Sequence, residues 1–469
     1  MDRSGRGPAD AAPHAHVVGI GGRGMAGLAQ SLAQRGMTVT GSEVVPGTAL
    51  EKWRKVGAGV RGADVPRAFS VKTRLLVHGP EIRREHPARL GALRRGIRQE
   101  TPARWLREQT RGRVGVVVAG GREAGVAAAM TGWVLTFAGM DPAVLLGTPA
   151  PQLGGWARGG SGPHLVAEWA GGADGLGEIG PDVALLLNVG SDPWVDRDRW
   201  AGAFRRFLAA VPDAETVLAL GHPSFLKGGA GVDRGPGRFE WVSLQRGGEW
   251  WGADLREESG RFRFRIFHRG RYVIEVRLQV AGLRNVLGAL SAVAACDRLG
   301  LPAATIRQGL EEFTGLSRDF ESLGSFRGVT LVDDEAGDAA SIQEALAIAR
   351  DSFGGRRLWA VCSAPAAPPG PVECRRFLSA VAVADRVLIV EVVPAAGRTS
   401  PVVCAGRPLT RALIAAGRQA RRVSGPAGAI SELDRHLEPG DVLLTLGAGD
   451  VGTIADALLR RLPRDRQDG

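Results

Sequence analysis

Short apolar segments alternate with longer segments of helical periodicity along most of the chain. In the first hundred residues the apolar segments 16–20, 37–40 and 75–78 are expected to be strands, and helices are expected from the turn after residue 20 to about residue 35 and over residues 87–95. This alternation is typical of a parallel sheet covered by helices. It predicts a Rossmann-like domain over residues 14–110, preceded by a disordered lead at residues 1–13.

The same alternation continues through two more regions. In the second, strands are expected at 114–118, 165–168, 183–189 and 217–220, an antiparallel pair at 262–267 and 272–276 around Arg269-Gly270, and a closing helix at 283–298. In the third, strands are expected at 330–333, 358–361, 386–389 and 442–446, with helices between them. With a linker near residues 314–318, the pattern predicts an α/β chain of three consecutive domains: a Rossmann-like domain, a P-loop-type central domain at 111–317 and a Rossmann-like C-terminal domain at 318–469.

The strand, turn and helix at residues 114–135 have the layout of a phosphate-binding loop without its usual side chains. A P-loop holds phosphates with backbone N–H groups and a lysine, and a Ser or Thr hydroxyl helps to hold magnesium. Here the turn reads AGGREAGV over residues 119–126, with neither lysine nor hydroxyl. Glu123 also places a negative charge where a phosphate would lie. The turn therefore predicts a nucleotide-binding fold with weakened phosphate binding.

A second glycine-rich turn follows the first predicted strand, over residues 19–27. Gly21, Gly22, Arg23, Gly24 and Met25 stand where the following helix begins. The N-terminal amides of a helix form a favourable site for a pyrophosphate, and glycines let the backbone approach it closely. The alternative is a glycine turn that serves only the packing of strand against helix.

Composition excludes some classes of protein and leaves others open. The formal net charge is +11, but the basic residues are almost all scattered arginines, so we interpret the charge as a solvated surface and expect no nucleic-acid partner. The 4 cysteines are widely spaced and have no metal-ligand spacing, which fits a reducing compartment. The polar lead has no apolar core of a signal peptide, and no apolar segment is long enough to span a bilayer. A cytoplasmic location is expected.

Several ordered motifs resemble those of one family. They are HVVGIGGRGMAGLAQSL from His16, VTGSEVVPG from Val39, GLRNVLGALSAVAA from Gly282 and PGDVLLTLGAGDVGTIADALLRRL from Pro439. Together they resemble the Mur ligase family, and within it the UDP-N-acetylmuramate–L-alanine ligases, from His16 to about Leu462. The resemblance implies ATP-dependent amide formation, in which a carboxylate is activated as an acyl phosphate and then attacked by an amine. It also implies that the first glycine turn binds a UDP-sugar, with Ser42 and Glu43 near the uridine.

The motifs that hold ATP in this family are only partly present. The family's phosphate loop reads AGTHGKTTT, so the resemblance places Ala124 at the lysine and Gly125 and Val126 at the threonine pair. The positions left for a degenerate ATP site are Gly120, Gly121, Arg122, Gly125 and Asn285.

The acidic motifs are also reduced. Glu168 is what remains of EADESD, and Asp192 lies in a motif whose histidine ligand is replaced by Pro193. In the third domain Asp333 is retained, but the paired histidines that follow it in the family are gone. As a set, the three carboxylates at strand ends are candidates for a metal site. We interpret them as remnants or turn residues, and expect no resident metal.

These observations predict a Mur ligase homologue that is impaired in ligation. It is expected to retain the binding of a UDP-N-acetylmuramate-like nucleotide sugar and to act in peptidoglycan precursor metabolism. The alternative is an active ATP-dependent ligase with a divergent phosphate site, in which Arg122 substitutes for the lysine. ATP and Mg²⁺ are expected cofactors only under that alternative. A basic nucleic-acid-binding protein is a third possibility that rests on charge alone.

Overall fold

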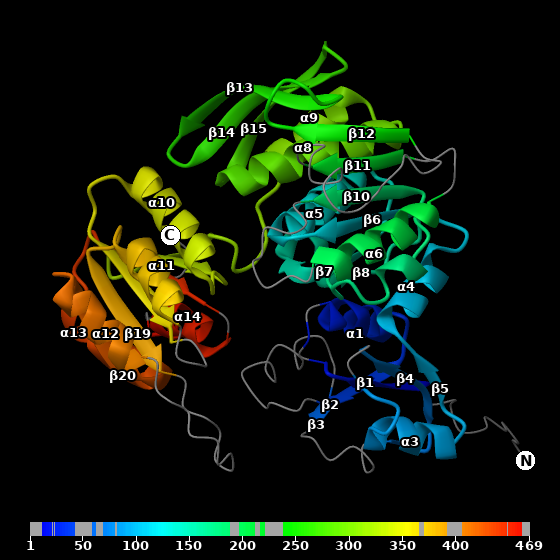
Figure 1. The fold of residues 1–469 in the computed structure, drawn as a ribbon, viewed down its shortest axis with the longest axis horizontal. Helices are drawn as coiled ribbons and strands as arrows, with labels where there is room; N and C mark the ends of the chain where they lie inside the picture. The colour runs from blue at the N-terminus through cyan, green and yellow to red at the C-terminus, as the bar shows by residue number, and fades with distance from the viewer. Residues whose placement is uncertain are drawn as a thin grey trace, which may run out of the picture. The chain divides into compact units, whose positions relative to one another are not determined.

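The strands of the computed structural model form three separate sheets. The structure describes residues 12–20, 22, 24–42, 59–61, 69–79, 82–187, 197–211, 216–220, 238–364, 370–391, 406–447 and 449–461. Figure 1 shows the three sheets in chain order, and they confirm the predicted α/β class with three sheet-containing domains. The chain divides into two compact units, each described by itself: Met1–Leu255, Phe264–Val276 and Arg284–Phe313 form the first, and Arg256–Arg263, Arg277–Leu283 and Thr314–Gly469 form the second.

The first sheet has five parallel strands in the order β3-β2-β1-β4-β5. The strands are β1 (His14–Val18), β2 (Thr38–Ser42), β3 (Gly59–Arg61), β4 (Thr73–His78) and β5 (Arg98–Glu100), and the helices are α1 (Met25–Gln34), α3 (Pro87–Arg94) and α4 (Pro102–Thr110). All of β1 is buried, as the central strand of a doubly covered parallel sheet should be. The strand predicted at 16–20 ends two residues earlier, because Gly19 adopts a φ of 74° and turns the chain toward α1.

The second sheet has ten strands in the order β15-β14-β13-β12-β11-β10-β6-β9-β7-β8. The strands are β6 (Val114–Gly120), β7 (Ala143–Ala150), β8 (Gly155–Arg158), β9 (His164–Trp169), β10 (Val183–Leu187), β11 (Thr216–Leu220), β12 (Arg238–Ser243), β13 (Trp250–Glu258), β14 (Arg261–His268) and β15 (Arg271–Ala281). The helices are α5 (Arg122–Phe137), α6 (Arg197–Ala209), α8 (Leu283–Arg298) and α9 (Ala303–Glu311), with short 3₁₀ turns η1 (Pro151–Leu153) and η2 (Leu176–Glu178).

The predicted turn at Arg269-Gly270 is present between β14 and β15. Both residues have positive φ, 49° and 80°, as a two-residue hairpin turn requires. The strand predicted at 183–189 is β10, which ends at Leu187; residues 188 and 189 lie outside the described residues.

Helix α5 lies in the interior of the central domain. Eleven of its residues, from Ala124 to Leu135, are buried. A helix that is apolar on nearly all faces is stable in water only when other elements pack against it on all sides. Two glycines on neighbouring helices allow close packing: a side chain at Gly288 of α8 would meet Val126, and one at Gly309 of α9 would meet Val134.

The third sheet has six strands in the order β16-β17-β21-β18-β19-β20, all parallel except the pair β16–β17. The strands are β16 (Glu321–Phe326), β17 (Val329–Asp334), β18 (Leu358–Ser363), β19 (Arg386–Glu391), β20 (Gln419–Ser424) and β21 (Val442–Leu446). The helices are α10 (Ala339–Phe353), α11 (Pro371–Val381), α12 (Gly406–Ala415), α13 (Gly425–His436) and α14 (Gly452–Leu459), with the 3₁₀ turn η3 (Gly449–Val451). The four strands predicted here are confirmed. Within the described part of the chain, every helix is too short or too polar to cross a bilayer.

Candidate functional site

The glycine turn between β1 and α1 is tied to the end of the neighbouring strand β2. The backbone carbonyl of Ser42 accepts hydrogen bonds from the N–H groups of Gly19 at 2.9 Å and Ile20 at 3.3 Å. Gly24 then caps α1 with a φ of 80°, and the helix begins at Met25. The turn therefore presents the N-terminus of α1, with its partial positive charge, at the carboxyl edge of the first sheet. Gly21, Arg23 and Glu43 lie outside the described residues.

The side chain of Ser42 belongs to a chain of hydrogen bonds along β1 and β2. Its hydroxyl lies 3.2 Å from Nε2 of His16, and Nδ1 of the same histidine lies 2.8 Å from the hydroxyl of Thr40. Ser42 is buried, with an exposed fraction of 3%. The structure thus uses Ser42 to order the strand end beside the glycine turn, and its predicted role near a uridine stays a prediction.

A cavity of about 230 Å³ opens between the first and central domains, within the first compact unit. From the first domain it is lined by Gly22, Gly24 and Met25, and from the central domain by Glu168 and Trp169. The fold therefore brings the predicted glycine turn and one predicted carboxylate to the same cavity. Sequence reasoning missed the remaining lining residues, which include Trp105, Leu145 and Ala170. The side chain of Trp105 is buried, with an exposed fraction of 5%.

The carboxylate of Glu168 is held between two glycines of the central domain. It is 7% exposed and accepts a hydrogen bond of 2.7 Å from the backbone N–H of Gly147 on β7. A Cβ built at Gly125 of α5 would lie 3.1 Å from Glu168 Oε2, and one built at Gly147 would be equally close. A threonine at position 125, as the family's phosphate loop has, would crowd this carboxylate.

Strand β6 and helix α5 are joined through one residue, Gly121. Its N–H donates to the carbonyl of Leu187 at 3.0 Å, and Gly120, with a φ of 151°, lies so close to β10 that a Cβ would fall 1.7 Å from the same carbonyl oxygen. Arg122 is already the first helical residue. A P-loop encircles a phosphate with several non-helical residues, and a one-residue connection has no such length. Ala124, at the family's lysine position, is buried at 1% exposure.

Asn285, one of the positions predicted for an ATP site, lies in the first turn of α8 and is buried at 3% exposure. It stands one helical turn before Gly288, the position at which α8 packs against Val126 of α5. Asn285 therefore lies on the helix that packs against α5, and its place in an ATP site stays a prediction.

Asp333 lies in the second compact unit and is committed to an ion pair. Its Oδ2 accepts from Nε of Arg318 at 2.7 Å, and its Oδ1 accepts from the hydroxyl of Thr445 at 2.6 Å. Burial alone would lower the pKa of Arg318, but the neighbouring carboxylates, Asp333 first, raise it, so the guanidinium stays charged. Asp192 lies outside the described residues. Across the described ranges, no three His, Cys, Asp or Glu side chains are grouped as metal ligands.

Two family models match this chain. Residues 14–113 match the one described as "Mur ligase family, catalytic domain", and residues 320–449 match "Mur ligase, glutamate ligase domain". A UDP-N-acetylmuramate–L-alanine ligase of Acidithiobacillus ferrooxidans is 30% identical, and the alignment covers 94% of this chain and 96% of that relative. The chain belongs to the Mur ligase family.

Other similarities of this Mur ligase homologue agree with that assignment. A UDP-N-acetylmuramate–L-alanine ligase of Kineococcus radiotolerans is 32% identical over 95% of this chain and 96% of the relative. The crystal structure of UDP-N-acetylmuramate-alanine ligase from Thermotoga maritima has the same fold, with a TM-score of 0.78 at 22% identity over 96% of this chain and 98% of that one. A murein peptide ligase from Psychrobacter arcticus follows with a TM-score of 0.69 at 20% identity, covering 96% of this chain and 98% of that one.

Proposed function

We propose that this Mur ligase homologue belongs to the UDP-N-acetylmuramate–L-alanine ligase branch and acts in peptidoglycan precursor metabolism. In this proposal it binds a uridine diphosphate sugar and is impaired in ATP-dependent ligation. The names of its relatives support the branch. The one-residue connection between β6 and α5 is the observation that best supports impaired ligation.

ATP-dependent amide formation depends on held phosphates, because positioning and charge stabilisation supply most of the catalysis of phosphoryl transfer. The connection through Gly121 leaves no loop to surround a phosphate, and Ala124 is buried where the family has its lysine. Losing one preorganised donor raises a barrier by ~3 kcal/mol. Because the loop, the lysine and the hydroxyls are all missing, we expect ligation to be very slow or absent.

Binding of the nucleotide sugar is supported by the first glycine turn, which, unlike the connection between β6 and α5, keeps the glycines that a pyrophosphate needs. Gly22, Gly24 and Met25 line the cavity, so the N-terminus of α1 borders it. The cavity also has the apolar surfaces of Met25, Trp105 and Trp169. Such a site holds a diphosphate at the helix N-terminus and leaves apolar walls for the rest of the ligand.

Isothermal titration calorimetry of the full chain tests both parts of the proposal. We expect saturable binding of UDP-N-acetylmuramate and no saturable binding of ATP, with or without Mg²⁺. The Gly22→Val variant serves as the control for the first site, because Gly22 lines the cavity and an added side chain would crowd the Gly19 carbonyl and Met25. ATP binding without UDP-sugar binding would contradict the proposal.

The active-ligase alternative keeps Arg122 as a substitute cation. Arg122 stands at the helix start, two positions before Ala124, and a guanidinium differs in shape and reach from an ammonium. ATP and Mg²⁺ are cofactors only in this alternative, with Gly120, Gly121, Gly125 and Asn285 around the nucleotide. Formation of ADP with UDP-N-acetylmuramate and L-alanine, abolished by Arg122→Ala, would establish it.

A further inference from the structure

A second cavity of about 230 Å³ lies at the opposite end of the domain interface from the glycine-lined cavity. Arg113 directly precedes β6, Val144 is near the start of β7, and Leu165 is near the start of β9, so the cavity lies at the amino ends of these parallel strands. The glycine-lined cavity lies at the carboxyl end, where β9 finishes at Trp169. The two cavities share only the walls formed by Trp105 and Leu145.

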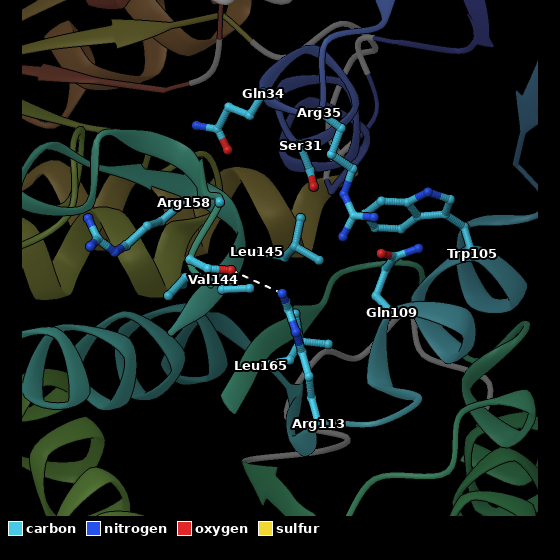
Figure 2. A pocket seen from close by; sticks show the side chains of 13 residues that line it. Ser31, Gln34, Arg35, Trp105, Gln109, Arg113, Val144, Leu145, Arg158 and Leu165 are labelled. Atoms are coloured by element: carbon cyan, nitrogen blue, oxygen red, sulfur yellow. Dashed lines mark hydrogen bonds between the residues drawn. The ribbon is translucent and has the colours of Figure 1, made fainter. Parts of the chain in front are cut away.

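Two arginines from different domains face this second cavity. Figure 2 shows Arg35, from just after α1, and Arg113, from the central domain, directed toward the same space, whereas Arg158 points away from it. Arg158 is paired with Asp141 at 2.8 Å. Within the described ranges, Arg35 and Arg113 have no carboxylate partner; Arg113 donates to the carbonyl of Gly160 at 3.0 Å, and Arg35 lies 5.9 Å from the centre of the Trp105 ring.

The two guanidinium groups are close enough to disfavour one another. Partial burial lowers the pKa of Arg35 below its ordinary value, and the positive charge of Arg113 lowers it further. Like charges held together in this way are stabilised by an anion between them, and guanidinium donors favour oxyanions that accept several hydrogen bonds at once. Ser31 and Gln109 add a hydroxyl and an amide to the same wall.

We propose that this cavity binds a small phosphate monoester between Arg35 and Arg113. A phosphate monoester carries a charge of about −1.5 to −2 at neutral pH, which matches two guanidinium groups. Its tetrahedral oxygens accept from donors on opposite sides, whereas a planar carboxylate presents its oxygens to one side. The space is far larger than the ~10–15 Å³ that one water needs, and Leu145, Leu165 and Trp105 provide apolar surface for the organic part.

A ligand held there would connect the first and central domains. Arg35 follows α1, whose Gln30 and Gln34 already hydrogen-bond to the backbone at Gly154 and Ala157 of the central domain. Because the ligand binds only when Arg35 and Arg113 face one another, it stabilises the docked arrangement of the two domains. The site is therefore suited to a regulatory ligand and not to the ligation chemistry.

The test is calorimetry of the full chain with inorganic phosphate and with glycerol phosphate, at fixed ionic strength in chloride. We expect one saturable site, weakened at least tenfold by Arg35→Ala and by Arg113→Ala. Arg107→Ala is the matched control, because Arg107 is exposed on α4 outside the cavity and its removal changes the net charge equally. Gln109→Glu, which adds a negative charge without shortening a side chain, should abolish binding.

Each of the following outcomes would overturn the proposal. The first is an absence of saturable binding by either probe. The second is binding that Arg35→Ala, Arg113→Ala and Gln109→Glu leave unchanged, or that Arg107→Ala weakens equally. The third is loss of binding in Gly22→Val, which would place the phosphate in the glycine-lined cavity. Succinate, a dicarboxylate of similar charge, should bind at least tenfold more weakly, and equal affinity would contradict the phosphate class.

Discussion

Substitution of Ala124 by lysine restores the residue that the family's phosphate loop carries, but the structure predicts destabilisation. Ala124 is 1% exposed in the first turn of α5, so a longer side chain has no room without displacement of its neighbours. Overpacking of this kind costs roughly 1–3 kcal/mol. An ammonium without a partner must also be neutralised or reach water, and neutralising a lysine at pH 7 costs up to about 5 kcal/mol.

We therefore expect Ala124→Lys to lower the free energy of unfolding by at least about 3 kcal/mol, which corresponds to a fall in Tm of ~6–12 °C for a domain of about 200 residues. Thermal denaturation followed by circular dichroism measures the shift, and calorimetry with MgATP should still detect no binding. Ala304→Lys is the matched control, because it makes the same change at an exposed position of α9. A variant with wild-type Tm that binds MgATP would refute the reasoning, since it would require the first turn of α5 to unwind into a phosphate loop.

Three further predictions concern the first compact unit. Gly22→Val should raise the dissociation constant for UDP-N-acetylmuramate at least tenfold in calorimetry with an unchanged circular dichroism spectrum; an unchanged constant would make the glycine turn a packing feature only. Gln30→Ala should lower the free energy of urea unfolding by about 2–4 kcal/mol, because it removes three hydrogen bonds to the backbone of residues 154–157; a loss below about 1 kcal/mol would contradict this. Burial lowers the pKa of His164, so the native state keeps this imidazole neutral, and the free energy of unfolding should fall as the pH falls below about 6.5. His164→Leu should reduce this pH dependence in urea titrations between pH 7.5 and pH 5. An equally steep loss of stability in the variant would contradict the prediction.

The sequence predicted the strands that are buried on both faces. Strands such as β6, β10 and β21 are short runs of apolar residues with the whole strand or nearly all of it inside, so their pattern is unambiguous. The pair β7–β8 was missed, because β7 contains Gly147 and Pro149 and its residues 147–149 are only partly buried. Strand β13 was missed for a similar reason: only two of its nine residues are buried, and its pattern is not apolar.

The site was predictable only where its residues are neighbours in the sequence. The glycine turn and the connection between β6 and α5 each lie within one continuous segment, so their local chemistry could be read directly. The cavity that joins Gly24 to Glu168 depends on how α1 docks on β7 and β8, which no local pattern specifies. Similarly, Arg35 and Arg113 are two of many scattered arginines, and only the fold shows that they face one another.

The direct connection of β6 to α5 also bears on how this lineage can evolve. A lysine and two hydroxyls are each reachable by a few nucleotide changes, but each would first appear on a helix turn whose positions 124 and 125 are already packed. The first replacements would lower stability before any of them created a place for a phosphate. Because natural proteins lie close to their stability threshold, such intermediates are removed by selection. The connection thus opposes the appearance of a phosphate loop, because the packing of positions 124 and 125 must be disrupted before the first turn of α5 can unwind.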